Sequence, residues 1–461
     1  MYLDGGGIRG YSSLLILQRI MKRIAQIETT QMDDVHHSSA DYPWGELSGA
    51  RANNNQSEQD RFRPCHYFDY IAGTSTGGLS AIMLGRLRMS VSQALANYER
   101  FGNDVFGKAR LWHGTSPFWY PRPKYSTTKT ETTIKAMITE QLGLEPWDAK
   151  EELFMTNEDQ TRWCARGLDI PRLGDHRGAD MSRIYEVARA TSAAPSYFDP
   201  IEIKGSVHFD GAIRANNPSC KVITEVWYKE NYRVPALFLS IGTGKYIRVD
   251  DGKNTDRPGA FQSLVKTDHR YKLGRRQTIT SLFNMATDLV KQMTNAEEAV
   301  EPWKVLCEDV HRRGRQGNPI GRIEPWWHRL NVKNTRRAIA MDEWIPRKSR
   351  RDQKGGDETL QHITSITNEY LDREGVRDEI NRIASALVEK RRARVKTEHW
   401  ERFALKVSYP YHPDDHQHPQ QFDTREELRT YLERQHRSNI PLSPRAMHEE
   451  LNKSRQVLRW Y

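Results

Sequence analysis

The fold of this chain is decided by one stretch, Tyr70-Ile71-Ala72-Gly73-Thr74-Ser75-Thr76-Gly77-Gly78-Leu79-Ser80-Ala81-Ile82-Met83-Leu84. Its apolar start predicts a buried strand and its apolar end predicts a helix. Between them, Gly73 to Gly77 fit the G-x-S-x-G pattern of a nucleophile elbow, a sharp strand-to-helix turn that projects the serine hydroxyl. The helix would direct its free N–H groups at the same point. Ser75 is therefore a candidate nucleophile, and a simple turn of small residues is the alternative.

A second glycine cluster stands near the start of the sequence, Asp4-Gly5-Gly6-Gly7-Ile8-Arg9-Gly10. Its glycines satisfy the G-x-G-x-x-G pattern of a dinucleotide-binding turn, and Glu28 follows at about the spacing of a ribose-binding acid. However, only Met1-Tyr2-Leu3 precede the loop, and no clear second strand leads to that acid. The same loop could instead direct backbone N–H groups at an oxyanion, which would also give Ser75 a role.

A serine nucleophile needs a group that accepts its proton. The chain has 16 histidines, and none stands in a telling context. His412, His416 and His418 fall in a polar, proline-containing stretch that predicts a loop. Phe209-Asp210-Gly211-Ala212 places an aspartate after apolar residues, with small residues behind it. An isolated Asp-Gly pair is usually a simple turn, so these residues alone leave the base open between Asp210 and the histidine of a Ser-His-Asp triad.

Alternating strand and helix signals predict an α/β fold with a mainly parallel sheet and helices on both faces. The pattern continues to about residue 245, where a buried strand, Ala236 to Ile241, ends at Gly242-Thr243-Gly244. We therefore predict two units, a catalytic domain over residues 1–245 and a largely helical, basic region over 246–461. Helices are expected over 275–312 and 358–405, and the second has a hydrophobic face formed by Val376, Ile380, Ile383 and Leu387.

The net charge is +10, and the whole excess lies in the second half of the chain. The basic run at residues 390–396 could bind lipid headgroups or direct nuclear import, but a solvated helix end is the favoured interpretation. We expect no nucleic-acid partner. The four cysteines are scattered, which is typical of free thiols in a reducing compartment. No apolar run is long enough to span a bilayer and no signal peptide is visible, so the expected location is cytoplasmic.

Two polar or aromatic segments interrupt the α/β pattern. Residues 29–64 are expected to be a surface insertion in which His36-His37 is solvated. Residues 107–128 are expected to be a long loop that could contact an anionic membrane surface, or else pack over the sheet. The aromatic and basic residues of this loop are Arg110, Trp112, Phe118, Trp119, Tyr120, Arg122 and Lys124.

Several sequence blocks together resemble the signature of the patatin-like phospholipase family. The length and general character of the chain resemble those of the family's fungal members. These blocks are Asp4–Gly10, Gly73–Gly78, Ala188–Pro195, Asp210–Ala212, Asn216–Pro218 and Ser240–Gly244. The resemblance implies a Ser–Asp dyad with Ser75 as nucleophile and Asp210 as base. It also implies that Gly5, Gly6, Gly7 and Arg9 surround the oxyanion, with Gly73 and Gly77 forming the elbow. Family members carry a full strand before the glycine loop, so here the strand is a stub or the sequence is truncated.

The expected function is calcium-independent hydrolysis of phospholipid or other lipid acyl esters, of the phospholipase A type, through an acyl-enzyme. No cofactor and no metal site are expected, because neither H-E-x-x-H nor an EF-hand loop occurs. A soluble enzyme with a lipid substrate implies peripheral contact with membranes. The alternative from a different class is a non-catalytic lipid-binding or interaction module. The sequence makes no prediction about the oligomeric state.

Overall fold

The computed structural model of the chain describes most of the segments that the sequence analysis singled out. The described residues are 1–30, 60, 62–108, 114–115, 121–142, 182–203, 205–229, 235–246, 296, 300–314, 326–334, 339–344, 356–395, 407–411, 420–422, 425–435, 444–454 and 456–457. The expected insertion at 29–64 lies mostly outside these residues, as do Arg110, Trp112 and Phe118–Tyr120 of the aromatic loop.

A four-stranded parallel sheet forms the centre of the molecule, with strand order β2-β1-β7-β9. These strands are β1 (Tyr2–Leu3), β2 (Ala72–Gly73), β7 (Phe238–Ile241) and β9 (Trp327–Leu330). The short β1 pairs with β2 on one side and with β7 on the other, and both of its residues are fully buried. The expected parallel α/β architecture is confirmed, and the two-residue first strand occupies the middle of the sheet.

Both faces of this sheet are buried, as expected where helices cover a parallel sheet on each side. Leu3, Leu239 and Ile241 belong to the larger hydrophobic core. Their neighbours Tyr2 and Phe238 point to the opposite face and pack in a second core that contains the tryptophan side chains Trp303 and Trp326. Alternate side chains of β1 and β7 therefore pack into the two cores on opposite faces of the sheet.

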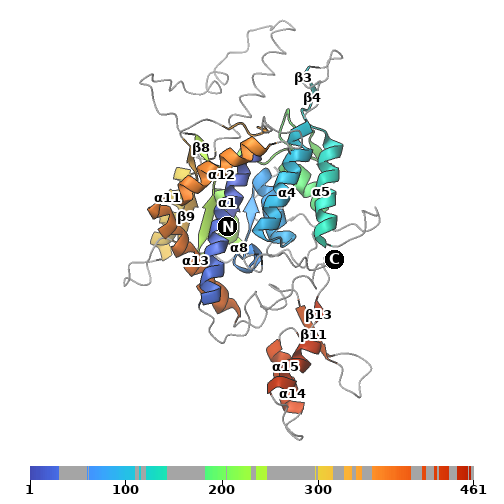
Figure 1. Cartoon of the computed structure of the whole chain (residues 1–461), viewed down its shortest axis with the longest axis vertical. Helices are drawn as coiled ribbons and strands as arrows, with labels where there is room; N and C mark the ends of the chain where they lie inside the picture. The colour runs from blue at the N-terminus through green and yellow to red at the C-terminus, as the bar shows by residue number, and fades with distance from the viewer. Residues whose placement is uncertain are drawn as a thin grey trace.

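Helix α1 and three helices that contact it lie on the larger core (Figure 1). They are α1 (Gly10–Thr30), α4 (Val91–Asp104), α12 (Asp357–Leu371) and α13 (Glu374–Val395). Helix α1 starts directly after the glycine loop and contacts the other three. The hydrophobic face predicted for the helix near 380 is confirmed, because Ile380, Ile383 and Leu387 are buried.

The remaining elements surround the sheet or lie beyond it. As far as β10 they are the 3-10 turns Gly7–Arg9, Pro64–His66 and Phe106–Lys108, then α3 (Thr76–Ala81), a π-helical turn (Ile82–Arg86), β3 (Gly114–Thr115), β4 (Pro121–Arg122), α5 (Thr127–Leu142), α6 (Ile184–Thr191), β5 (Ile201–Ile203), β6 (Ser206–His208), α7 (Ala212–Ala215), α8 (Ser219–Lys229), β8 (Lys245–Tyr246), α11 (Val300–Gly314) and β10 (Lys333–Asn334). A small unit with its own core follows, made of β11 (Val407–Tyr411), β12 (Gln420–Phe422), α14 (Arg425–Gln435), α15 (Pro444–Lys453) and β13 (Gln456–Val457).

The sheet continues past the division expected at residue 245. Strand β9 pairs in parallel with β7, and α12 and α13 pack on α1. The second half is helical as expected, and it also contributes strands, the edge strand of the main sheet among them. The core therefore joins segments from both halves of the sequence.

The basic run at the end of α13 is not a solvated helix end, and that expectation was wrong. Arg391 is buried and pairs with Glu28 of α1 at 2.7 Å. Arg392 reaches the same carboxylate at 3.2 Å, and Arg394 pairs with Asp69 at 3.1 Å. These arginines fasten α13 to α1 and to the segment before β2.

The stretch at 107–128 differs from the expected long loop in its described part. It contains the β3–β4 hairpin, and helix α5 begins at Thr127. Lys124 forms an ion pair with Asp342, whose carboxylate also accepts a hydrogen bond from the Tyr125 hydroxyl at 2.8 Å. The ammonium group of Lys124 is therefore bound by protein in this structure.

Candidate active site

Ser75 lies at the turn between β2 and α3 and has φ 55° and ψ −127°, a backbone conformation that non-glycine residues rarely adopt. The two elbow glycines make this turn possible. A Cβ atom on Gly73 would lie 2.1 Å from the Gly77 carbonyl oxygen, and one on Gly77 would lie 2.5 Å from that of Leu3. The elbow therefore packs directly against β1, and the strain presents a half-buried serine hydroxyl at the carboxyl end of the sheet.

The Ser75 hydroxyl donates a hydrogen bond to Oδ2 of Asp210 at 2.7 Å. The other carboxylate oxygen, Oδ1, accepts from the backbone N–H of Ala212 at 2.8 Å. The Ser75 N–H donates to Oγ1 of Thr191 at 3.0 Å, which holds the elbow against α6. The structure thus brings together the two residues that the sequence singled out separately, 135 positions apart.

Burial raises the pKa of Asp210 from 3.8 to about 7. The hydrogen bonds from Ala212 and Ser75 oppose this shift but do not cancel it. The carboxylate is completely shielded from solvent. A carboxylate with so high a pKa is a far stronger base than an ordinary aspartate, and it still loses its proton near neutral pH.

The glycine loop lies beside Ser75. A Cβ atom on Gly5 would lie 3.1 Å from Cβ of Ser75 and 2.3 Å from Oδ1 of Asn216. The Gly5 N–H donates to the Asn216 carbonyl at 3.0 Å, so this amide is already engaged. Within the described part of the chain, no such acceptor is recorded for the amides of Gly6 and Gly7. Of the three glycine amides, only that of Gly5 therefore has a recorded backbone acceptor in the described residues.

Gly7 is held from the second half of the sequence. It has φ +58°, and a Cβ atom there would lie 2.0 Å from the carbonyl oxygen of Met341. That carbonyl accepts a hydrogen bond from Ile8 N–H at 2.6 Å. The Gly7 carbonyl accepts from the hydroxyls of Thr76 at 3.1 Å and Tyr98 at 2.5 Å. Contacts with Met341, Thr76 and Tyr98, which lie on three separate segments, therefore fix the conformation of the glycine loop.

Arg9 braces the loop in this structure. Its Nε donates to the Gly6 carbonyl at 3.3 Å, and burial lowers the pKa of its guanidinium group. No hydrogen bond from Arg9 to Ser75 or Asp210 occurs among the described residues. Its recorded contact keeps the turn closed and does not reach the dyad.

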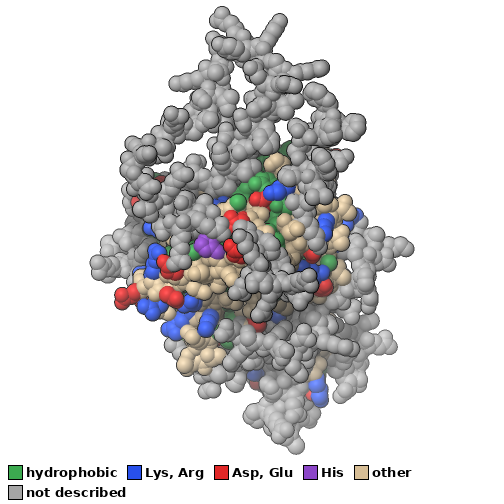
Figure 2. Space-filling view, turned by 45° about the horizontal axis from the view of Figure 1, so that its top comes forward, with side chains coloured by type: hydrophobic (Ala, Val, Ile, Leu, Met, Phe, Trp, Pro, Cys, Tyr) green, Lys and Arg blue, Asp and Glu red, His purple; other side chains and the backbone are tan. Residues whose placement is uncertain are grey.

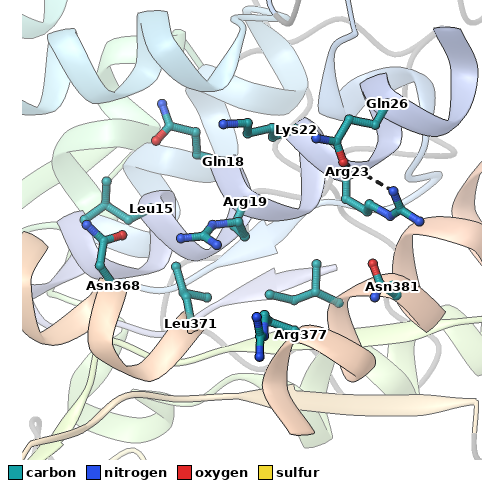
Figure 3. A pocket seen from close by; sticks show the side chains of 11 residues that line it. Leu15, Gln18, Arg19, Lys22, Arg23, Gln26, Asn368, Leu371, Arg377 and Asn381 are labelled. Carbon is teal, nitrogen blue, oxygen red and sulfur yellow. Dashed lines mark hydrogen bonds between the residues drawn. The ribbon is translucent and has the colours of Figure 1, made fainter. Parts of the chain in front are cut away.

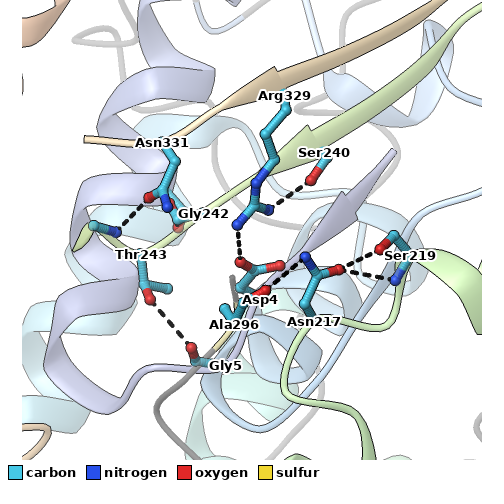
Figure 4. A network of polar contacts seen from close by, with 12 residues as sticks. Asp4, Gly5, Asn217, Ser219, Ser240, Gly242, Thr243, Ala296, Arg329 and Asn331 are labelled. Atoms are coloured by element: carbon cyan, nitrogen blue, oxygen red, sulfur yellow. Dashed lines mark hydrogen bonds and ion pairs between the residues drawn. The ribbon is translucent and has the colours of Figure 1, made fainter. Parts of the chain in front are cut away.

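A buried polar network supports the loop from behind (Figure 4). Arg329 of β9 reaches Oδ2 of Asp4 at 2.7 Å and the Ser240 hydroxyl of β7 at 2.6 Å. The Thr243 hydroxyl donates to the Gly5 carbonyl at 3.1 Å, and Asn331 accepts from Gly244 N–H at 2.7 Å. Sequence reasoning missed this network, because Trp327–Leu330 is a short segment whose partner strand lies far away in the chain. Its one signal is weak, namely the aromatic pair Trp326-Trp327 and the β-branched Val332 after Pro325.

The structure does not support a dinucleotide-binding site at the glycine loop, because Glu28, the expected ribose-binding acid, lies far from it. Glu28 is buried at the far end of α1, where its carboxylate binds Arg391 and Arg392. At a rise of about 1.5 Å per residue, helix α1 separates it from the glycine loop by roughly 27 Å. The loop itself adjoins Ser75, so the two glycine motifs form one site.

Other groups considered from the sequence lie elsewhere. His36-His37, His412, His416 and His418 are outside the described residues. In the part of the chain that the structure describes, no three His, Cys, Asp or Glu side chains gather as a metal site would require, and no helix is both long and apolar enough to cross a membrane. Cys65, Cys220 and Cys307 are free thiols.

Comparison with known proteins agrees with the motif blocks. The family model for patatin-like phospholipase matches residues 1–219. Calcium-independent phospholipase A2-gamma of Mus musculus is 26% identical over 310 residues, which are 64% of this chain and 32% of that protein. Patatin-like protein 4 of Arabidopsis thaliana is 23% identical over 319 residues, 64% of this chain and 70% of that protein. The chain matches less than a third of the length of the phospholipase A2-gamma relatives.

Proposed function

Because residues 1–219 belong to the patatin-like phospholipase family, we propose that this chain is a lipid acyl hydrolase that works through a Ser75–Asp210 dyad. The observation that carries the proposal is the 2.7 Å hydrogen bond from the strained Ser75 to the buried Asp210 carboxylate. This distance lies within the range of about 2.6–3.2 Å in which a base can take the serine proton.

In the first half of the reaction, Oγ of Ser75 attacks the ester carbonyl carbon while its proton passes to Asp210. The carbonyl oxygen becomes an oxyanion, which the N–H groups of Gly6 and Gly7 would stabilise from the glycine loop. Collapse of this intermediate breaks the ester C–O bond, and Asp210 returns the proton to the alcohol that leaves. The acyl chain remains as an ester on Ser75.

In the second half, a water molecule attacks the acyl-enzyme and gives its proton to Asp210. The second tetrahedral intermediate releases the fatty acid as the proton returns to Oγ of Ser75. The Asp210 carboxylate thus acts first as a base and then as an acid in each half of the reaction. A pKa of about 7 suits both roles, because the carboxyl group can take and return the proton near neutral pH.

The surface beside the dyad supports a lipid substrate. Two of the large apolar residues that the described surface exposes, Val207 at 56% and Phe209 at 40%, lie within three positions before Asp210 in the sequence. Figure 2 shows hydrophobic side chains gathered in the upper middle of the face turned forward, bordered by charged ones. Contiguous exposed apolar side chains are typical of surfaces that meet a membrane or another apolar partner. Hydrolysis of defined phospholipids would identify the headgroup and the acyl position that the enzyme prefers.

We propose further that hydrolysis is independent of calcium, because Ser75 and Asp210 supply both the nucleophile and the proton transfers. Chelation with EDTA should leave turnover unchanged. A loss of activity that added Ca²⁺ restores would contradict this point. The enzyme would meet its substrate as a peripheral protein in the cytoplasm. Sedimentation with vesicles tests the peripheral binding, and fractionation of cells tests the compartment.

The test of the function is hydrolysis of defined phospholipids in mixed micelles by the full chain. Ser75→Ala and Asp210→Asn should each abolish release of fatty acid. Ser80→Ala is the matched control, since Ser80 lies on the same helix and its hydroxyl donates to the Thr76 carbonyl at 3.1 Å, with no contact to the dyad among the described residues. Activity that survived in Asp210→Asn but was lost in a histidine variant would favour the Ser-His-Asp alternative.

A non-catalytic lipid-binding module is the competing function. The stub strand is what favours it, yet β1 is buried and paired on both sides. Folded protein that binds vesicles but releases no fatty acid from any phospholipid or simple ester would favour this module over the hydrolase.

A further inference from the structure

A groove runs between α1 and the junction of α12 with α13, on the molecule's helical face. Its volume is about 590 Å³, within the range of roughly 300–1,000 Å³ typical of sites for small ligands. Figure 3 shows the side chains of α1 facing those of α12 and α13 across it. Arg23, which lines the groove, lies 13 residues after Gly10 on α1, roughly 20 Å along the helix from the glycine loop. Neither Ser75, Asp210 nor any residue of the glycine loop lines the groove, so it is a site separate from the dyad.

The lining of this groove is cationic. Four of its residues carry positive charge, Arg19, Lys22, Arg23 and Arg377, and none is acidic. Amide side chains such as Gln18 and Asn381 add neutral donors, and Leu15, Leu371 and Ile380 supply an apolar floor. The combination of several cations with amide donors matches the oxygens of a phosphate group.

Most of these charges have no carboxylate partner within the described residues. Arg19 pairs with Asp372 at 3.2 Å, and both side chains are substantially exposed, so the pair is weak. Arg23 reaches only the amide oxygen of Gln26, at 3.3 Å, and its Nε is buried without a recorded partner. No ion pair is recorded for Lys22 or Arg377 in the described part of the chain.

The placement of the cations opposes the stability of α1. Arg19, Lys22 and Arg23 stand at i, i+3 and i+4, so their side chains share one helix face and repel each other. Arg377 adds a fourth positive charge from the opposite wall. An anion in the groove would convert this repulsion into attraction and would join α1 to α13.

We propose that this groove binds a phosphate-bearing ligand, as a site separate from the Ser75–Asp210 dyad. The shared chemistry is a phosphomonoester or phosphodiester group, which either a soluble phosphate ester or a lipid headgroup could present. The proposal concerns binding and does not depend on the proposed hydrolase activity.

The experiment measures binding by the full-length chain with two kinds of probe at matched ionic strength. Inorganic phosphate and glycerol 3-phosphate test the soluble source by calorimetry and thermal shift. Vesicles of phosphatidylcholine with and without phosphatidic acid test the lipid source by sedimentation. The test variant is Lys22→Gln/Arg23→Gln/Arg377→Gln, and the control variant is Lys304→Gln/Lys453→Gln, which removes exposed cations of α11 and α15.

The wild-type chain and the control variant should bind at least one probe class, and the groove variant should bind it at least tenfold more weakly. The groove variant should also fold, because the three side chains are not buried in the core. Saturation by the soluble esters would assign the ligand to the soluble class, and binding restricted to phosphatidic acid vesicles would assign it to the headgroup class. Equal binding by the groove variant, or no binding of either probe class by wild type, would overturn the proposal.

Discussion

Replacing Asp210 with asparagine should stabilise the folded chain at alkaline pH while removing the catalytic base. Asparagine keeps the shape of the side chain. Its amide oxygen can still accept from Ala212 N–H, and its NH₂ group can donate to Oγ of Ser75. What changes is that a buried group can no longer be ionised.

The size of the effect follows from the pKa of Asp210. Its value rises from 3.8 to about 7 on folding, because burial disfavours the charged form. Between these values the folded state holds a proton that the unfolded state has lost, so the stability of the wild type falls as pH rises. The fall is complete above about pH 7 and amounts to at most about 4 kcal/mol, since each pKa unit corresponds to 1.36 kcal/mol. The asparagine side chain does not titrate, so the variant would have no such dependence.

The assay is urea denaturation of wild type and Asp210→Asn at several pH values between about 4 and 8. The variant should gain a few kcal/mol relative to wild type near pH 8, and the gain should vanish near pH 4. Ser75→Ala is the control, because it keeps the carboxylate and should show no such gain. A variant that is less stable than wild type at pH 8, or a difference independent of pH, would refute the reasoning.

Three further perturbations follow from the same geometry. Hydrolysis should lose about tenfold per pH unit below an apparent pKa near 7, because protonated Asp210 cannot accept the serine proton; a flat profile down to about pH 5 would contradict this. Gly5→Ala should reduce fatty-acid release by about a hundredfold or more, since its methyl group would meet Asn216 beside the nucleophile, whereas Gly375→Ala, with open space around it, should keep full activity. Arg329→Met should lower the free energy of unfolding by about 3–5 kcal/mol, because the buried Asp4 carboxylate then lacks the Arg329 cation. Adding Asp4→Asn should recover part of that loss in urea denaturation. If the effects of the two substitutions simply add, the stabilising role of the Asp4–Arg329 pair is refuted.

The local features of the site could be predicted from the sequence because each one is written in adjacent residues. A glycine, a serine and another glycine between a strand and a helix specify the elbow at Ser75 with little help from the rest of the chain. The residues around Asp210 and in the glycine loop left alternatives open, and the family resemblance assigned their roles. Their joining at one place was implied by the family resemblance, since no local pattern states that positions 135 residues apart make contact.

The support of the site could not be predicted, because it depends on pairings across the whole chain. Arg329 and Asp4 are 325 positions apart, and the four-residue strand that carries Arg329 has no strong strand signal. The arginines at 391–394 were interpreted as solvated because a sequence displays a charge but not its partner. The partner of the first two is Glu28, buried at the end of α1.

The same pairings bear on where the catalytic unit ends. We propose that it includes residues 326–344 and 356–395 in addition to 1–245, because these segments supply β9, the Met341 carbonyl beside Gly7, and two helices on α1. The family model, which covers 1–219, contains the dyad but not these supports.

The central claim is that Ser75 is an activated nucleophile, and covalent labelling measures this directly. The full-length chain is incubated with a fluorophosphonate probe, and the modified peptide is identified by mass spectrometry. The account predicts one adduct on Ser75, formed by wild type and by Ser80→Ala, and lost or greatly slowed in Asp210→Asn because the serine proton then has no acceptor. Folded wild-type protein that remains unlabelled, or an adduct that forms equally fast without the Asp210 carboxylate, would contradict it.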